Sequence, residues 1–159
     1  MTSRLLVDKI EGKTTANTVE MPSGSVIQVV SSEYSTETST TSQSFVDSGH
    51  NLTITPKFST SKVLINLMGG RMSYGGLGQI SVNILASING GSYVDVHLAI
   101  DLLLMSSTYG LNMSSQKLHS PNTTGPVIYK TQFGSSNGNQ QYYTTSSCVV
   151  TLTAMEIAG

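Results

Sequence analysis

Apolar and polar residues alternate in short runs along most of this chain, and a period of two is the pattern of β-strands. Residues 79–86 alternate in this way, and residues 93–100 form a second run shortly after them. Asn89-Gly90-Gly91 lies between the two runs and is a strong signal for a tight hairpin turn. No stretch has the 3.6-residue period of an amphipathic helix.

Similar runs predict further strands in the rest of the chain. Asp47-Ser48-Gly49 is interpreted as a turn that separates two strands, and Gly69-Gly70-Arg71 as the end of another. Residues 31–44 are rich in Ser and Thr, which predicts a solvated loop or a weak edge strand. The further strands are predicted within 25–30, 45–56, 62–68, 113–119, 127–133 and 148–157.

Roughly nine or ten strands with turn signals every 8–12 residues are typical of a sandwich or barrel. We therefore predict an all-β fold, an antiparallel β-sandwich of the jelly-roll type. Gly134 to Asn139 is predicted to be a turn that needs positive φ, between the last two long strands.

The final run, residues 148–157, is apolar at alternate positions and again at positions between them. Both faces of such a strand are expected to be covered, which places it in the middle of a sheet. One face would pack on the core of the domain, and the other on a second copy of the same surface. The residues predicted to form this trimer seam are Val149, Thr151, Leu152, Met155 and Ile157.

Composition limits the classes of function that are possible for this chain. A chain of 159 residues supports one domain with a sizeable core, and its net charge of −1 gives no nucleic-acid footprint. Cys148 is the single cysteine, which excludes an intrachain disulfide and the usual zinc sites, and it is expected to be a small buried apolar residue. No apolar stretch approaches the length of a secretory signal or a membrane span, so membrane insertion is not expected.

The first 24 residues are predicted to be an extended docking arm, and residues 25–159 the sandwich domain. The arm has too few apolar residues to fold by itself, so we expect it to dock on a neighbouring chain. Its predicted docking residues are Leu5, Leu6, Val7, Ile10, Val19 and Met21.

Both ends of the chain also resemble a known group of proteins. Residues 120–124, 127–133 and 152–159 are similar to the C-terminal ending of short virion proteins, labelled tail-fibre-like, from marine and cyanobacterial phages. Residues 7–10 and 21–30 are similar to the N-terminal region of the same proteins. The order of elements also looks like the C1q/TNF-like trimeric jelly roll. The resemblance implies a homotrimer with its final strand near the three-fold axis, located in a virion.

Catalysis has little support in the sequence. Asp95 and His97 share one face of a predicted strand, and Asp101 follows, so they are a weak candidate for a divalent metal. The polar face of an ordinary strand is the better interpretation. We predict no catalytic residue, no metal site and no cofactor.

Aromatic and amide side chains in the predicted loops are the material of contact surfaces for glycans or proteins. The candidate residues for contact with a host glycan are Tyr74, Tyr109, Asn137, Asn139, Tyr142 and Tyr143. At least one of Tyr142 and Tyr143 is expected to face inward, because neighbours on a strand point to opposite sides.

The function that these observations favour is a non-enzymatic structural protein of a phage particle. It would be a homotrimeric, tail-associated component that binds other virion proteins through its arm. A capsid decoration protein that clamps the shell is the alternative, and a free carbohydrate-binding module of the lectin type is a further one. An enzyme is the class least favoured.

Overall fold

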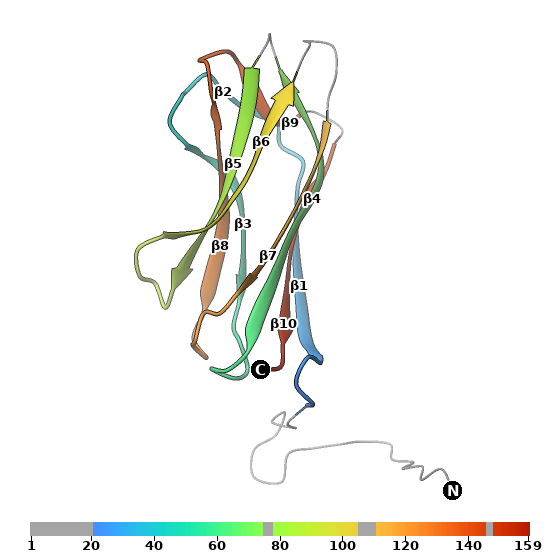
Figure 1. Cartoon of the computed structure of the whole chain (residues 1–159), viewed down its shortest axis with the longest axis vertical. Helices are drawn as coiled ribbons and strands as arrows, with labels where there is room; N and C mark the ends of the chain where they lie inside the picture. Colours follow the sequence, from blue (N-terminus) through green and yellow to red (C-terminus); the bar gives the residue numbers. More distant parts are fainter. Residues whose placement is uncertain (1–20, 75–77, 105–110, 146–147) are drawn as a thin grey trace, which may run out of the picture.

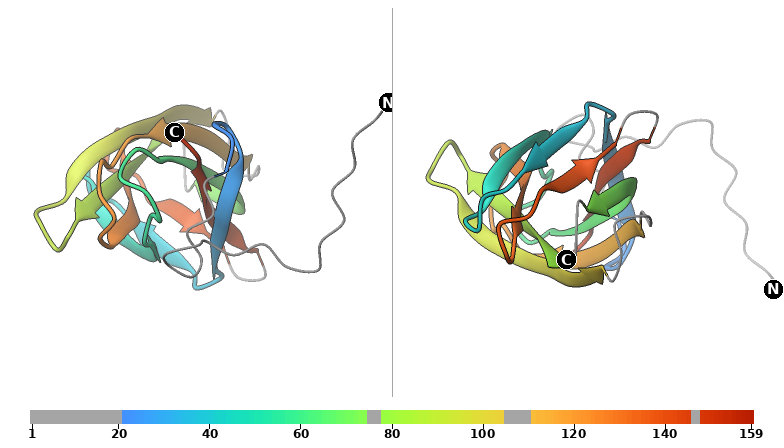
Figure 2. Two further views of the ribbon diagram at one scale, coloured as in Figure 1. Left: turned by 90° about the horizontal axis from the view of Figure 1, so that it is seen from below. Right: turned by 90° about the horizontal axis from the view of Figure 1, so that it is seen from above.

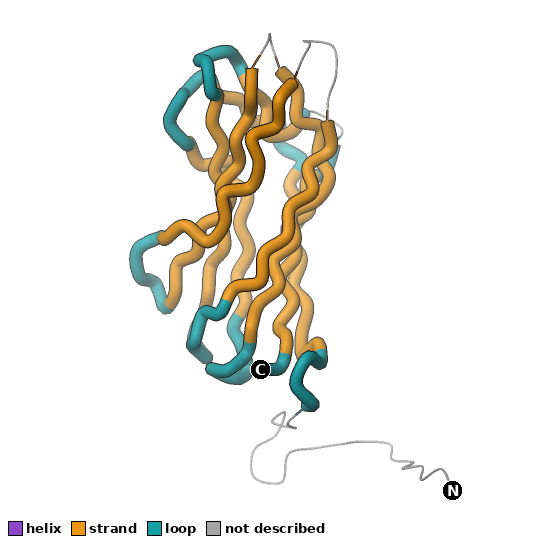
Figure 3. Tube along the Cα trace, in the orientation of Figure 1, coloured by secondary structure: helices purple, strands orange, loops and turns teal. Residues whose placement is uncertain are grey.

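The computed structural model describes residues 21–74, 78–104, 111–145 and 148–159. These residues form ten β-strands and, as Figure 3 shows, no helix. The all-β prediction is therefore confirmed. The strands are β1 (Val26–Tyr34), β2 (Thr38–Thr40), β3 (Val46–Ile54), β4 (Lys62–Tyr74), β5 (Gly78–Ile88), β6 (Val94–Leu104), β7 (Leu111–His119), β8 (Val127–Ser135), β9 (Gln141–Thr144) and β10 (Val150–Ile157).

Two antiparallel sheets pack face to face, and Figure 2 shows the layers from either end. One sheet has the order β1-β10-β4-β7, and the other has the order β3-β8-β5-β6. We call them the β1 sheet and the β3 sheet. If the eight long strands are numbered along the chain, these orders are 1-8-3-6 and 2-7-4-5, which is the strand order of a jelly roll. The short strands β9 and β2 extend the β1 sheet from the far end of β4.

The final strand lies in mid-sheet, as its apolar pattern predicted. β10 pairs with β1 on one side and with β4 on the other. Its burial alternates strictly, since Val150, Leu152, Ala154 and Glu156 point into the sandwich and the residues between them point outward.

The hairpin at Asn89 is also confirmed. Asn89 and Gly90 both have positive φ, 53° and 75°, and they join β5 to β6. Two positive φ angles in succession are the geometry that the Asn-Gly pair favours in a two-residue turn.

Two predicted breaks in strands are wrong. Asp47-Ser48-Gly49 is not a turn but a bulge within the continuous strand β3, where the register with β8 shifts. Gly69 and Gly70, at φ 87° and 72°, likewise bend β4 without ending it. A Cβ on Gly70 would lie 2.5 Å from a methyl carbon of Val150 on β10, so any other residue at this position would force its neighbours to shift.

Residues 31–44 were predicted to be either a solvated loop or a weak edge strand, and they contain both. β1 continues to Tyr34, and β2 is a three-residue edge strand that pairs with β9. Cys148 was expected to be buried in the final strand, but it is half-buried and lies in the turn before β10, where its N–H donates to the carbonyl of Thr145.

The core lies between the two sheets and contains aliphatic residues from both, with Tyr129, Phe133 and Tyr143 as its largest fully buried side chains. The sandwich has two distinct ends. The start of β1 and the C-terminus lie at one end, which we call the base, and the β8–β9 turn lies at the opposite end (Figure 1).

Candidate assembly surface

The outer face of the β1 sheet carries an unbroken aliphatic row across four strands. Val29 of β1 pairs with Met155 of β10, Met155 with Leu64 of β4, and Leu64 with Leu118 of β7. Residues directly opposite each other on antiparallel strands point to the same face, with Cβ atoms about 4.5–5.5 Å apart. The four side chains therefore form one continuous apolar strip, which we call the aliphatic row.

The row next to it is polar and uncharged. It contains Ser31, Thr153, Asn66 and Gln116. On the other side, Val26 and Ile157 pair at the base and extend the apolar surface toward Lys62.

Several large apolar side chains on this face are exposed to water. Val29 is 56% exposed and Leu118 48% exposed, although both are large aliphatic residues. Val26 and Met68, also on this face, are about as exposed. Exposed apolar side chains gathered on one face, with few charges among them, mark a surface that another molecule covers.

The residues predicted for the trimer seam divide according to this geometry. Thr151, Met155 and Ile157 lie on the outer face, and Val149 is exposed directly before β10. The prediction for Leu152 is wrong, because this residue is fully buried between the sheets of its own chain and cannot contact a partner. The sequence made both faces of the strand apolar, and only the pairing shows which residues point outward.

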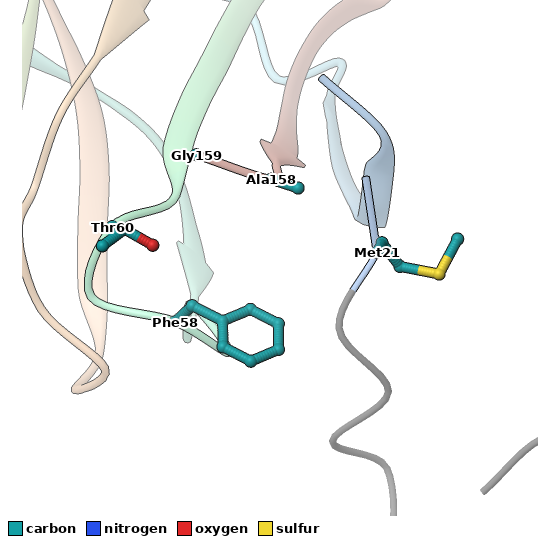
Figure 4. Close-up of a pocket in the computed structure, with 5 residues that line it drawn as sticks. All are labelled: Met21, Phe58, Thr60, Ala158 and Gly159. Carbon is teal, nitrogen blue, oxygen red and sulfur yellow. The ribbon is translucent and has the colours of Figure 1, made fainter. Parts of the chain in front are cut away.

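The base carries a small pocket of about 40 Å³ at the lower edge of this surface. Figure 4 shows its lining residues, which come from the segment before β1, the β3–β4 loop and the residues after β10: Met21, Phe58, Thr60, Ala158 and Gly159. Its volume is far below the roughly 300 Å³ at which small-molecule sites begin.

A buried carboxylate fixes the wall of this pocket. Glu156 is fully buried, and its Oε1 accepts hydrogen bonds from the backbone N–H groups of Lys57, at 2.7 Å, and Phe58, at 3.3 Å. Its Oε2 accepts one from the Gln28 amide at 2.6 Å. The carboxylate is thus satisfied without a cation in these contacts, and it holds the β3–β4 loop against β10.

The candidate glycan-contact residues lie in different environments. Asn137 and Asn139 are exposed in the β8–β9 turn, at the end opposite the base, and Tyr142 is half-buried on β9. The prediction for Tyr143 is wrong, because its side chain is fully buried in the core and is not accessible from outside. Tyr74 ends β4, and Tyr109 lies outside the described residues.

Tyr143 belongs instead to a buried hydrogen-bonded ring that the sequence did not predict. Its hydroxyl lies 3.0 Å from Nδ1 of His50 and 3.0 Å from Oγ1 of Thr131. Ser48 Oγ lies 2.6 Å from Thr131 Oγ1 and accepts the backbone N–H of His50. Tyr34 stacks on the His50 ring, with centroids 5.3 Å apart.

The donor and acceptor roles in this hydrogen-bonded ring follow from one carbonyl group. His50 Nε2 lies 3.1 Å from the carbonyl oxygen of Ser32, which can only accept, so Nε2 carries the proton. Nδ1 is then the acceptor in the neutral imidazole, and Tyr143 donates to it. Burial raises the pKa of the Tyr143 hydroxyl, which keeps this donor protonated.

This arrangement contains a serine and a histidine but is not a catalytic site. Ser48 bonds to Thr131 and to a backbone N–H, and no contact joins its Oγ to the imidazole. Both Ser48 and His50 are only 1% exposed, so no substrate reaches them. The ring joins β3 to β9 and β1 across the sandwich.

A second histidine–tyrosine pair links the sheets nearer the base. His119 Nδ1 on β7 lies 2.8 Å from the hydroxyl of Tyr129 on β8. Burial lowers the pKa of His50, although its bond to Ser32 partly opposes this, and burial and the nearby Lys117 charge lower the pKa of His119. Both imidazoles therefore favour the neutral form in the folded protein.

We expect the domain to lose stability in acid for this reason. A histidine with a lowered pKa in the folded state binds fewer protons there than in the unfolded chain, whose value is about 6.5. The stability that such a histidine contributes to the folded state is complete above that pH and is lost as the pH falls below it. Urea unfolding at pH 8 and pH 5 should show a lower free energy of unfolding at pH 5. In His119→Gln the difference should be smaller, and equal free energies at both pH values in the parent protein would contradict the expectation.

Asp95, of the predicted Asp95 and His97 pair, has a hydrogen-bond partner on β5, and the side chain of Asp101 lies outside the described residues. The Asn83 amide donates to Asp95 at 2.6 Å, and the described residues contain no group of three or more side chains that could hold a metal. Among the strands that the structure describes, β6 is an edge strand that pairs only with β5, and charged side chains on an edge discourage pairing with other chains. The polar pattern of β6 fits that role.

Within the described residues no helix is long and apolar enough to cross a membrane.

Most of the predicted arm lies outside the described residues. Met21 is the one predicted docking residue that the structure describes; its side chain is exposed, and the residue is one of the five that line the base pocket. The other five, Leu5, Leu6, Val7, Ile10 and Val19, precede it.

The chain matches no protein-family model and no curated protein. Among solved structures it is similar to the VP2 subviral particle of infectious bursal disease virus, with 14% identity and a TM-score of 0.43. It is similar to the structure of the Gt strain of that virus, with 15% identity and the same TM-score. All of this chain is covered, but it spans only 42% and 43% of the two viral chains. Similarity this low carries no argument about function.

Proposed function

We propose that this chain is a non-enzymatic structural protein of a phage particle, which assembles as a homotrimer through the outer face of its β1 sheet. The single observation that supports assembly most is the aliphatic row, Val29, Met155, Leu64 and Leu118, which crosses four strands with no other element over it among the described residues. The likeness of both chain ends to phage virion proteins supports the location in a virion.

The two ends of the sandwich support a division of roles. The N-terminal segment joins the domain at the base, so attachment to the particle is assigned to this end. The β8–β9 turn, with Asn137 and Asn139, lies at the opposite end and would point away from the particle. A tail-associated protein would use that end for host contact, whereas a capsid decoration protein would need only the base and the seam.

A charge in the aliphatic row tests the proposal. Val29→Glu should leave the fold intact, because Val29 is exposed, and should weaken trimer formation by about a hundredfold, because an interface charge without a partner costs several kcal/mol. Analytical ultracentrifugation at micromolar concentration measures the effect.

Thr53→Glu is the matched control, since Thr53 is an exposed strand residue on β3, in the other sheet. This control should remain trimeric. A monomeric parent protein, or a Val29→Glu protein as trimeric as the parent, would contradict the proposal.

A further inference from the structure

The chain contains two Asn-Gly pairs, Asn89-Gly90 and Asn137-Gly138, and each lies in an exposed turn between two strands. Asparagine is a thermolabile residue, and a glycine after it leaves the next backbone nitrogen open to the side-chain amide. We propose that Asn137 is a site of spontaneous deamidation and isoaspartate formation in the folded protein, whereas Asn89 is protected. The inference is independent of the proposed trimer.

The reaction needs only the protein and water. The Gly138 nitrogen bonds to Cγ of Asn137 and loses its proton, while the bond from Cγ to Nδ2 breaks and the nitrogen leaves as ammonia with that proton. Water then opens the cyclic imide at either of its carbonyl groups. Opening at the former backbone carbonyl gives isoaspartate, and opening at the former side-chain carbonyl gives aspartate.

Two hydrogen-bond donors point at the atom of Asn137 on which charge develops in this reaction. Its Oδ1 accepts from the backbone N–H of Asn139 at 3.2 Å and from the hydroxyl of Ser135 at 3.3 Å. Attack on Cγ turns Oδ1 into an oxyanion, and donors already aimed at a developing oxyanion lower the barrier. Ser135 is only 1% exposed, and its N–H donates to the carbonyl of Ser42, so this donor is held in place before the reaction.

The same contacts bring the reacting atoms together. The bond from Oδ1 of Asn137 to the N–H two residues later is an Asx turn, which folds the carboxamide over the Gly138 nitrogen between them. Gly138 has a φ of 80°, and a Cβ placed on it would meet no atom closer than the Thr41 carbonyl oxygen at 3.9 Å. Gly138 itself therefore presents no steric barrier to the attack.

Asn89 is also exposed, but its carboxamide is bonded to a different loop. Its Nδ2 donates to Oγ1 of Thr123 at 3.1 Å, and its Oδ1 accepts from the same hydroxyl at 3.3 Å. A side chain on Gly125 would collide with Oδ1 of Asn89, so the β7–β8 loop packs directly against this amide. Both bonds to Thr123 must break before Cγ of Asn89 can turn toward the Gly90 nitrogen.

The modification changes the end of the sandwich that lies opposite the base. Either product replaces the neutral Asn137 amide by a carboxylate, and isoaspartate also lengthens the backbone of the β8–β9 turn by one carbon atom. This turn is the one that the tail-associated role would use for host contact. Aged protein would then present a different contact surface from newly made protein.

Timed incubation in mildly alkaline buffer, followed by peptide mass spectrometry, gives the rate of deamidation at each asparagine. Asn137 should react about tenfold faster than Asn89, or more. An isoaspartate-specific methyltransferase with a labelled methyl donor measures the share of isoaspartate among the products. Equal rates at the two asparagines, or a faster rate at Asn89, would overturn the inference.

Two variants test the contacts in opposite directions. Ser135→Ala removes a donor and should slow the reaction at Asn137 by about tenfold, with the rate at Asn89 unchanged as a check that the fold is intact. Thr123→Ala releases the other amide and should speed the reaction at Asn89 without affecting Asn137. An unchanged rate at Asn137 in Ser135→Ala would contradict the assigned role of the hydroxyl.

The unfolded chain is the last control. In concentrated urea the contacts of both asparagines are lost, and each still precedes a glycine, so the two rates should become similar. If Asn137 kept its advantage in urea, the neighbouring sequence and not the folded turn would cause it, and the inference would be wrong.

Discussion

Leu152→Asp should abolish folding, whereas Thr153→Asp, one residue later on the same strand, should leave a folded domain. Leu152 is fully buried between the two sheets, and a carboxylate there has no cation or donor to satisfy it. The cost is several kcal/mol or more, against a total stability of about 5–15 kcal/mol for a domain. Circular dichroism and urea unfolding of the two purified proteins measure the difference.

Thr153 is the matched position, because it is half-buried on the outer face and its side chain stands beside the aliphatic row. Thr153→Asp should therefore weaken association and not folding. If Leu152→Asp folded as well as Thr153→Asp, the alternation of β10 would have to be the opposite of the one described.

Tyr143→Ala should cause the second large loss of stability, lowering the free energy of unfolding by about 3–5 kcal/mol. It removes one of the largest buried side chains and takes the donor away from His50 Nδ1. Tyr143→Phe keeps the ring but removes the hydroxyl, and should cost about 1–3 kcal/mol because Thr131 and His50 each lose a partner. Chemical denaturation gives all of these values.

Tyr142→Ala is the control for this pair, since Tyr142 is half-buried and points the other way. It should cost about 1 kcal/mol or less. A greater loss for Tyr142 than for Tyr143 would mean that the inward and outward residues of β9 are exchanged. Loss of host adsorption in Tyr142→Ala with no loss of stability would support the tail-associated role.

The sequence predicted well wherever the signal was local. The Asn89-Gly90 turn needs only two residues with positive φ, and the alternation of β5 identifies a strand without knowledge of its partners. Glycine was harder to interpret. Gly49 and Gly70 have the same positive φ as turn residues, but long-range pairing with β8 and close approach to β10 make them bulges.

The buried ring was missed for a related reason. Ser48, His50, Leu52 and Ile54 are all buried on the same face of β3, with the spacing of two that marks a strand. Interpreting Asp47-Ser48-Gly49 as a turn separated His50 from that pattern. Read as one strand, the run would have placed a histidine in the core and pointed to a buried partner. The partner itself, Tyr143, is 93 residues away and no local pattern identifies it.

The position of β10 between β1 and β4 has a consequence for synthesis and folding. Val26 pairs with Ile157, so the first strand of the domain has no neighbour in its sheet until the last strand has been made. Such non-local pairing gives a high contact order and folding times of about milliseconds to seconds. The aliphatic row takes Val29 from the first strand and Met155 from the last. A chain that lacks β10 therefore cannot present the complete aliphatic row.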